Sequence, residues 1–161
     1  MQLFAVGRIE RALRSFLTVA VALILSAIAS ICFIEVVRRP FGGSFVWYDE
    51  FIGYLLVWLT FLGAVLARSY HQHVGIDNLL ASVSPGARRI LELTAHGLMV
   101  AIHVVLLIYG AQLVLRFLSE RAITVDIPAG LVYLVIPLSA VFMLLIEAIQ
   151  IARLFASPDL D

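Results

Sequence analysis

Five ionisable side chains lie within long apolar runs of this sequence, where a charge is costly and is therefore a first candidate for chemistry. They are Glu35, Glu92, His96, His103 and Glu147. On a helix of about 3.6 residues per turn, Glu92, His96 and His103 fall within about 40° of one another. This polar stripe suits a proton path, a metal site or a seam against another polypeptide.

A metal site on the stripe is disfavoured by geometry. His96 and His103 are separated by roughly 10 Å along a helix, whereas zinc binds nitrogen at about 2 Å. A haem between two helices would need an intramembrane His on a second helix, and His71 and His73 lie in a loop. We favour structural roles, in which Glu92 and His96 form an i, i+4 pair and His103 hydrogen-bonds a neighbouring helix.

The two remaining carboxylates, Glu35 and Glu147, lie near the ends of their apolar runs, where they can reach the membrane surface or nearby Arg side chains. We expect structural roles for both. The sequence has no Ser/His/Asp set, no Gly-rich phosphate loop, no His/Cys cluster and no basic–aromatic nucleic-acid pattern. Cys32 is the single cysteine, so no disulfide can form within the chain. We predict no catalytic residue, no metal, no cofactor and no nucleic-acid partner.

The composition requires a membrane. Hydrophobic residues make up 63% of the 161 residues and charged residues 14%, with a mean hydropathy of +1.06. Soluble domains are about half apolar and a quarter charged. The chain is therefore predicted to be an all-α integral membrane protein, a single four-helix domain over residues 1–161 with transmembrane helices at 16–37, 46–67, 90–115 and 128–151.

Basic residues and connections predict the topology. Seven Arg lie on the side of both termini and the middle loop, and four lie on the other side, which places both termini in the cytoplasm. Apolar residues at helical spacing predict a short amphipathic surface helix in the loop 68–89. Residues 1–15 fit a similar interfacial helix or, as we prefer, a basic flank that sets topology. Pro137 is expected to kink the last span.

The stretch 46–77 has the most distinctive pattern. It opens on Asp49 and Glu50, in the first turn, where the positive end of a helix dipole favours carboxylates. Small residues then share one face, which suits close helix contact in lipid: Gly53, Thr60, Ala64 and Ala67. A chain of four short-looped spans without a recognisable repeat has no roomy substrate site, so we expect a component of a larger assembly.

This stretch resembles the small membrane subunit of TRAP (tripartite ATP-independent periplasmic) transporters. The resemblance rests on an acidic residue, a W-L-x-F-x-G-A core and an H-V-G-I-D exit, in the order Glu50, Trp58–Leu59, Phe61–Ala64, Arg68 and His73–Asp77. Residues 127–133, followed by Pro137, are similar to the family's fourth-span pattern. The likeness covers nearly the whole chain.

The resemblance implies an accessory, DctQ-like small permease subunit in a bacterial inner membrane. It implies a large permease subunit that holds the substrate and any coupled sodium, and a periplasmic substrate-binding protein that delivers an organic acid for symport. The expected subunit-interface residues are Glu50, Gly53, Trp58, Thr60, Gly63, Ala64, Arg68, His73 and Asp77. The expected periplasmic docking residues are Asp49, Arg116 and Arg121. The alternative function is an independent small oligomer that conducts protons or ions along the polar stripe.

Overall fold

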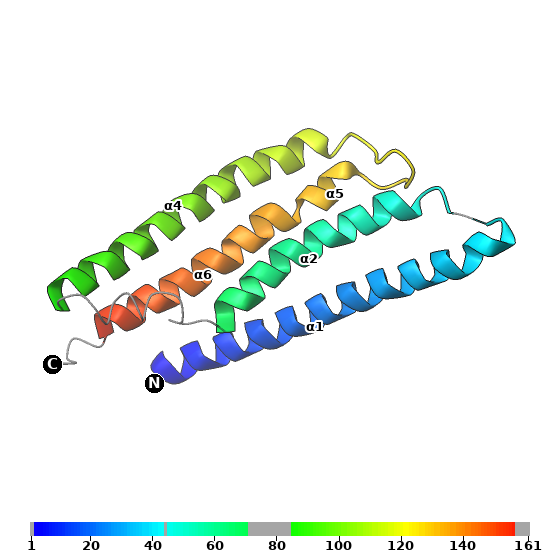
Figure 1. Ribbon diagram of the computed structural model, residues 1–161. Helices are drawn as coiled ribbons and strands as arrows, with labels where there is room; N and C mark the ends of the chain where they lie inside the picture. The colour runs from blue at the N-terminus through cyan, green and yellow to red at the C-terminus, as the bar shows by residue number, and fades with distance from the viewer. Residues whose placement is uncertain (1, 44, 71–84, 157–161) are drawn as a thin grey trace.

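The computed structural model describes residues 2–43, 45–70 and 85–156, and four long helices account for most of them (Figure 1). Four stretches are long and apolar enough to cross a membrane, which confirms the predicted all-α membrane fold with four spans: Glu10–Phe41, Tyr48–Tyr70, Ile90–Phe117 and Ala129–Ala152. The helices are α1 (Gln2–Arg38), the 3-10 turn η1 (Arg39–Phe41), α2 (Tyr48–Tyr70), α4 (Pro85–Phe117), α5 (Ala129–Tyr133) and α6 (Val135–Ala156).

Helix α1 is longer than its apolar core requires. Its 37 residues run without a break from Gln2, so the first fifteen residues continue the first span instead of forming a separate interfacial helix. At about 1.5 Å per residue the helix is roughly 55 Å long, against a hydrocarbon core of roughly 30 Å. Its first turns therefore reach beyond the apolar part of the bilayer.

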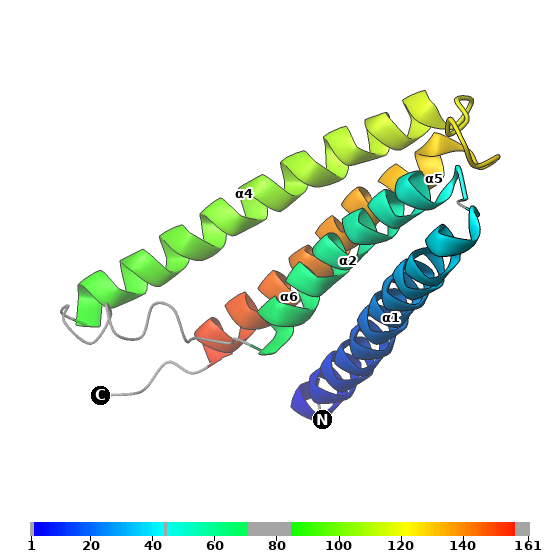
Figure 2. The same cartoon turned by 45° about the vertical axis from the view of Figure 1, so that its right-hand side comes forward.

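The helices form a row in the order α1, α2, α6, α4 (Figures 1 and 2). Helix α2 packs on α1 and α6, and α4 packs on α6 and α5, so that α1 and α4 form the two edges. The neighbours α1 and α2 are antiparallel, and so are α6 and α4, whereas the two inner helices α2 and α6 run parallel to each other (Figure 1). We call the end where α1 begins the N-terminal end, and the end with the α1–α2 and α4–α5 connections the hairpin end.

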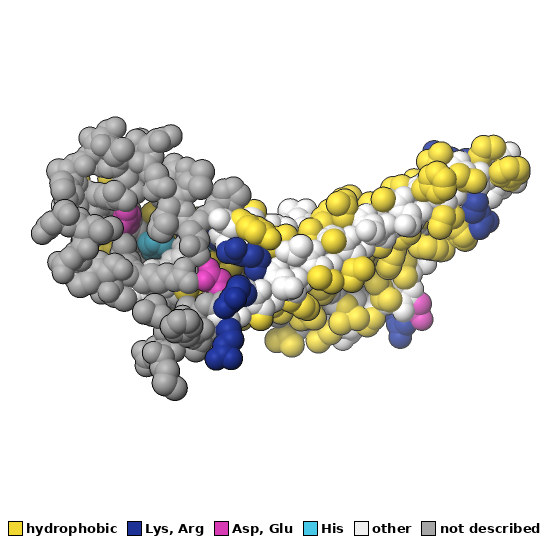
Figure 3. Space-filling model, turned by 90° about the horizontal axis from the view of Figure 1, so that it is seen from below, with side chains coloured by type: hydrophobic (Ala, Val, Ile, Leu, Met, Phe, Trp, Pro, Cys, Tyr) yellow, Lys and Arg dark blue, Asp and Glu magenta, His cyan; other side chains and the backbone are white. Residues whose placement is uncertain are grey.

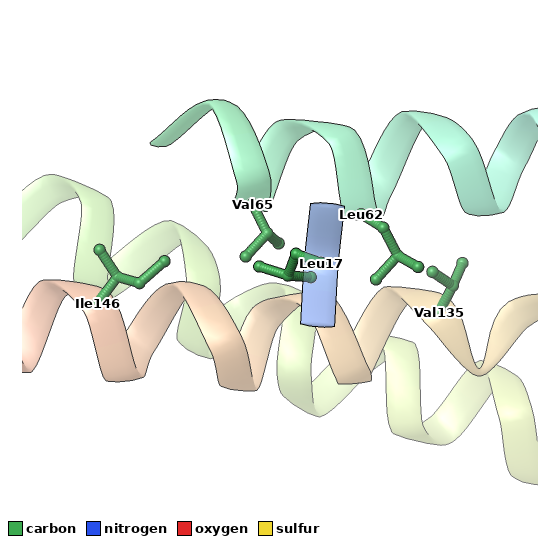
Figure 4. Close-up of a cluster of buried hydrophobic side chains, with 5 residues drawn as sticks. All are labelled: Leu17, Leu62, Val65, Val135 and Ile146. Atoms are coloured by element: carbon green, nitrogen blue, oxygen red, sulfur yellow. The ribbon is translucent and has the colours of Figure 1, made fainter. Parts of the chain in front are cut away.

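A small apolar core joins three of the helices. Leu17 of α1, Leu62 and Val65 of α2, and Val135 and Ile146 of α6 are buried together (Figure 4). The rings of Phe16 and Phe142 meet edge to face, with centroids 6.5 Å apart, at the side of this cluster. Helices α1, α2 and α6 thus share a core, and α4 is added on the outer side of α6.

Glycine allows α4 to approach the α5–α6 segment closely. A Cβ built on Gly110 would lie 2.9 Å from Ile136 Cγ2 and 3.1 Å from Pro137 Cδ. A Cβ on Gly130 would lie 2.8 Å from the carbonyl oxygen of Val114. Both positions exclude a larger residue, as expected where helices pack tightly in lipid.

The last span is interrupted as predicted. Helix α5 ends at Tyr133 and α6 begins at Val135, just before Pro137. Proline has no N–H to donate to the carbonyl four residues earlier, which here belongs to Tyr133. Regular hydrogen bonding resumes with Leu138 N, 3.2 Å from the carbonyl oxygen of Leu134. The surface helix expected in the loop 68–89 falls on residues 71–84, outside the described residues.

Candidate functional site: two polar belts across the helix row

A buried carboxylate connects three helices at the N-terminal end. Glu147 of α6 is 1% exposed, and its Oε1 accepts hydrogen bonds from Nε and Nη2 of Arg68 on α2, at 2.9 and 2.7 Å. Its Oε2 lies 2.6 Å from Nδ1 of His96 on α4. Gln150 Oε1 accepts a further bond from Arg68 Nη2 at 2.7 Å. Since a carboxylate only accepts, Nδ1 of His96 carries the proton.

The local sequence explains how these side chains meet. Arg68 lies in the last turn of α2, where its long stem reaches across to α6. Glu147 and Gln150 are three residues apart and so share one face of α6. A carboxylate at this depth is tolerated because it is paired and hydrogen-bonded on both oxygens.

Arg14 extends this network to the first helix. Its Nη2 donates to the carbonyl oxygen of Ser69 at 2.5 Å, and its guanidinium lies 4.5 Å from the ring centre of Tyr70. Carbonyls in the last turn of a helix lack a donor of their own, so Arg14 caps α2. The N-terminal belt, from α1 to α4 across the row, consists of Arg14, Arg68, Ser69, Glu147, Gln150 and His96.

A second carboxylate fastens the start of α2 at the hairpin end. Glu50 accepts bonds from the backbone N–H groups of Ile123 and Thr124, at 2.9 and 2.6 Å. The hydroxyl groups of Thr124 and Tyr54 donate to the same carboxylate. Ile123 and Thr124 belong to the connection between α4 and α5, which is itself a turn in which Ala122 N donates to Ile127 O at 3.0 Å. Glu50 therefore ties α2 to the connection between α4 and α5.

The end of α1 is tied to α2 in a similar way. Glu35 is 2% exposed, accepts a bond from the backbone N–H of Phe45 at 3.4 Å and lies 3.9 Å from Arg39 Nε. Arg39 also donates to the hydroxyl of Tyr48 at 3.1 Å. We call this set the hairpin belt: Glu35, Arg39, Tyr48, Glu50, Tyr54 and Thr124. Glu35 and Glu147, the two carboxylates expected near the ends of their spans, each lie beside an Arg side chain.

The polar stripe on α4 is divided between two environments. His96 reaches Glu147 on α6, a partner that sequence spacing did not indicate. His103 Nδ1 lies 2.6 Å from the carbonyl oxygen of Met99 on its own helix. The expected bond from His103 to a neighbouring helix stays a prediction. Glu92 is half-buried, and its pairing with His96 stays a prediction. Among the described residues, no hydrogen bond joins His96 to His103, as a direct proton path between them would require.

The small-residue face of α2 points away from the rest of the described chain. Thr60, Ala64 and Ala67 are exposed, and a Cβ added at Gly53 would meet no atom within 4 Å. Gly63 also has free space beside it. This face therefore does not serve close packing among the helices that the structure describes.

The other expected interface residues have different surroundings. Trp58 is half-buried against the apolar core, and Glu50 and Arg68 are occupied by the belts. His73 and Asp77 lie outside the described residues. The expected docking residues are exposed at the hairpin end, where Arg121 forms an ion pair with Asp126: they are Asp49, Arg116 and Arg121.

Several belt residues were missed by sequence reasoning. Arg14, Ser69 and Thr124 belong to a helix flank, a last turn and a connection, and nothing in their spacing indicates their partners. Tyr54 had a signal, because it follows Glu50 by four residues on the same helix. The role of Gln150 could have been predicted, since an amide three residues after Glu147 in an apolar helix needs a polar partner. Within the described ranges, no group of three or more His, Cys, Asp or Glu side chains could hold a metal ion.

These features define a multi-pass, all-α membrane protein whose four spans are fastened side by side at both ends. The chain belongs to the DctQ component family of the tripartite ATP-independent periplasmic transporters, whose model matches residues 28–157. That is a family of small permease subunits of bacterial inner-membrane transporters and not an enzyme family. Membership implies a tripartite system with a large permease and a binding protein.

Two relatives agree with this assignment. A TRAP transporter small permease protein of Haemophilus influenzae is 32% identical over 136 residues, which are 83% of this chain and 82% of the relative. The C4-dicarboxylate TRAP transporter small permease protein DctQ of Vibrio cholerae is 28% identical over 126 residues, 76% of this chain and 53% of that protein. The chain matches about half the length of the Vibrio protein.

Proposed function

We propose that this chain braces the large permease subunit of a TRAP-type secondary transporter. The observation that carries the proposal is the N-terminal belt, which links α1, α2, α6 and α4 through hydrogen bonds from Arg14 to the Ser69 carbonyl, from Arg68 to Glu147 and between Glu147 and His96. A subunit that braces another must keep its own helices in fixed relative positions. In lipid no hydrophobic effect holds helices together, so hydrogen bonds and close packing have to do so.

The exposed small-residue face of α2 supports contact with the large subunit. Thr60 donates its hydroxyl to the carbonyl oxygen of Leu56 at 2.8 Å, so this polar group is satisfied within its own helix. Gly53 and Ala64 allow another helix to approach the backbone closely. We propose that this face, and not a belt, receives a helix of the large subunit, with His73 and Asp77 as further contact candidates.

The transport reaction proposed is sodium-coupled uptake of an organic acid, delivered by the periplasmic binding protein. The name of the Vibrio relative, which includes C4-dicarboxylate, supports the substrate class. Sodium is expected in the large subunit, and no cofactor is expected in this chain. By the positive-inside rule both termini lie in the cytoplasm, so Asp49, Arg116 and Arg121 face the periplasm and the binding protein.

Reconstitution tests this function. The chain should co-purify with its large permease subunit, and the pair in liposomes should take up an organic acid only with a sodium gradient and the binding protein. The chain alone should give no uptake. Uptake by the chain alone, or equal uptake by the large subunit with and without it, would contradict the proposal.

A further inference from the structure

Basic side chains gather at the N-terminal end of α1. Arg8 and Arg11 are exposed, and the Arg14 side chain is 32% exposed. Glu10 is the acidic residue among them, with Oε1 3.9 Å from Arg14 Nη2. Figure 3 shows basic side chains aligned at one end of the row with an acidic side chain beside them. Three cations against one carboxylate leave this surface positively charged.

The depth of these residues matches the headgroup layer of a bilayer. The apolar run of α1 begins at Phe16, and each helical residue adds about 1.5 Å. Arg14, Arg11 and Arg8 then lie roughly 3, 8 and 12 Å beyond that point along the helix. The polar layer on each side of the hydrocarbon core is roughly 5–8 Å thick. The backbone of Arg14 and Arg11 therefore lies within this layer, and that of Arg8 lies roughly 4 Å beyond its outer edge, within reach of a long Arg side chain.

We propose that Arg8, Arg11 and the exposed part of Arg14 form a binding surface for an acidic phospholipid headgroup in the leaflet at this end. Guanidinium groups present paired N–H donors that match phosphate oxygens. Arg8 and Arg11 are three residues apart and so are neighbours on the helix surface. Arg14 is held in place by Ser69 O at 2.5 Å, and the half-exposed Tyr70 beside it suits the membrane boundary.

The arginines at the hairpin end contrast with this surface. The Arg38 guanidinium lies 4.0 Å from the ring centre of Phe45, and Arg39 contacts Glu35 and the Tyr48 hydroxyl. An acidic lipid is expected to bind preferentially where α1 begins, because Arg8, Arg11 and Arg14 lie within seven residues of one helix there. This inference does not depend on the proposed transport function.

The test uses the full chain in nanodiscs of phosphatidylcholine, with and without phosphatidylglycerol at about a third of the lipid. Retained phosphatidylglycerol is counted by native mass spectrometry, and the unfolding midpoint is measured in both lipids. The double variant Arg8→Gln/Arg11→Gln should bind phosphatidylglycerol roughly 25-fold more weakly, since each basic residue contributes roughly fivefold at an acidic surface. Arg8→Lys/Arg11→Lys should retain most of the binding, and Arg116→Gln should bind like the unchanged chain.

Each outcome decides the proposal. The proposal is supported if phosphatidylglycerol raises the unfolding midpoint of the unchanged chain and of the Lys variant but not that of the Gln variant. Unchanged phosphatidylglycerol binding by the Gln variant overturns it, and so does an equal loss in Arg116→Gln. Inorganic phosphate added to phosphatidylcholine discs should give no stabilisation; an equal effect of phosphate would identify a soluble anion site instead of a lipid site.

Discussion

At the scale of single residues, Glu147 and Glu50 organise the two ends of the molecule. Each carboxylate receives several donors from helices or connections distant in sequence. Glu147 is more deeply buried than Glu50, and its two oxygens contact an Arg and a His side chain. A charge buried in this way is stable only with its partners, so removal of one partner should cost more than removal of both.

The Arg68→Ala substitution tests this at the N-terminal belt. It leaves Glu147 without its cation and should lower the free energy of unfolding by about 3–5 kcal/mol. Replacement of both, as Arg68→Met/Glu147→Leu, should recover most of that loss. Unfolding of the purified chain in detergent measures both. In the double-mutant cycle of Arg68→Met and Glu147→Leu, strictly additive effects of the two single substitutions would show that the pair is not coupled.

The Glu50→Ala substitution tests the hairpin belt. It removes the acceptor of the Ile123 and Thr124 N–H groups, each bond to a charged group contributing about 1.5–3 kcal/mol. Amide hydrogen exchange at these two residues should accelerate markedly while exchange in the middle of α2 stays slow. The adjacent exposed Asp49→Asn is the control and should leave exchange unchanged. Persistent protection of both amides in Glu50→Ala would contradict the assigned role.

At the scale of elements, α2 is the central helix of the row. It packs on α1 and α6, contributes Leu62 and Val65 to the core, and carries a belt residue at each end. Helix α4 has a different position, because its long-range packing is on α6 and α5 at the edge of the row. Its attachment therefore depends on a close approach at Gly110 and on the His96–Glu147 contact.

A Gly110→Ala substitution should loosen α4. The added Cβ would lie 2.9 Å from Ile136 Cγ2 and 3.1 Å from Pro137 Cδ, so one helix must shift. We expect a loss of about 1–3 kcal/mol in unfolding free energy, typical of overpacking. Gly97→Ala on the same helix meets nothing within 4 Å and should be neutral or stabilising by up to about 1 kcal/mol. Equal unfolding free energies for the two variants would contradict the close approach.

At the scale of the whole molecule, a row of helices leaves broad surfaces uncovered by its own chain. Large apolar side chains are exposed on α1 and α4, as lipid contact requires. The small-residue face of α2 differs from these surfaces in allowing another backbone to come close. Because α2 is packed on α1 and α6 and is tied by polar contacts at both ends, a partner bound there would be held by the whole row.

The Ala64→Leu substitution tests this surface within the proposed complex. A larger side chain should hold the partner helix away and reduce co-purification of the large subunit by roughly tenfold, about 1–2 kcal/mol. The stability of the isolated chain should not change, because Ala64 is exposed. Ala101→Leu, at an exposed small residue of α4, is the control. Equal recovery of the large subunit with both variants would place the interface elsewhere.

The sequence by itself determined the four spans, the break before Pro137, the membrane setting and the resemblance that led to the family. These depend on local composition and periodicity, which the printed residues contain. It also indicated structural roles for Glu35 and Glu147 from their positions near span ends.

Only the tertiary structure decided which helices are neighbours and which polar groups meet. Arg68 and Glu147 are separated by 79 residues, and Glu50 and Thr124 by 74, so no local pattern relates them. The periodicity of the small residues of α2 indicated a packing face. It did not indicate which helix would pack against that face. The row order exposes that face because α1 and α6 cover the opposite side of α2.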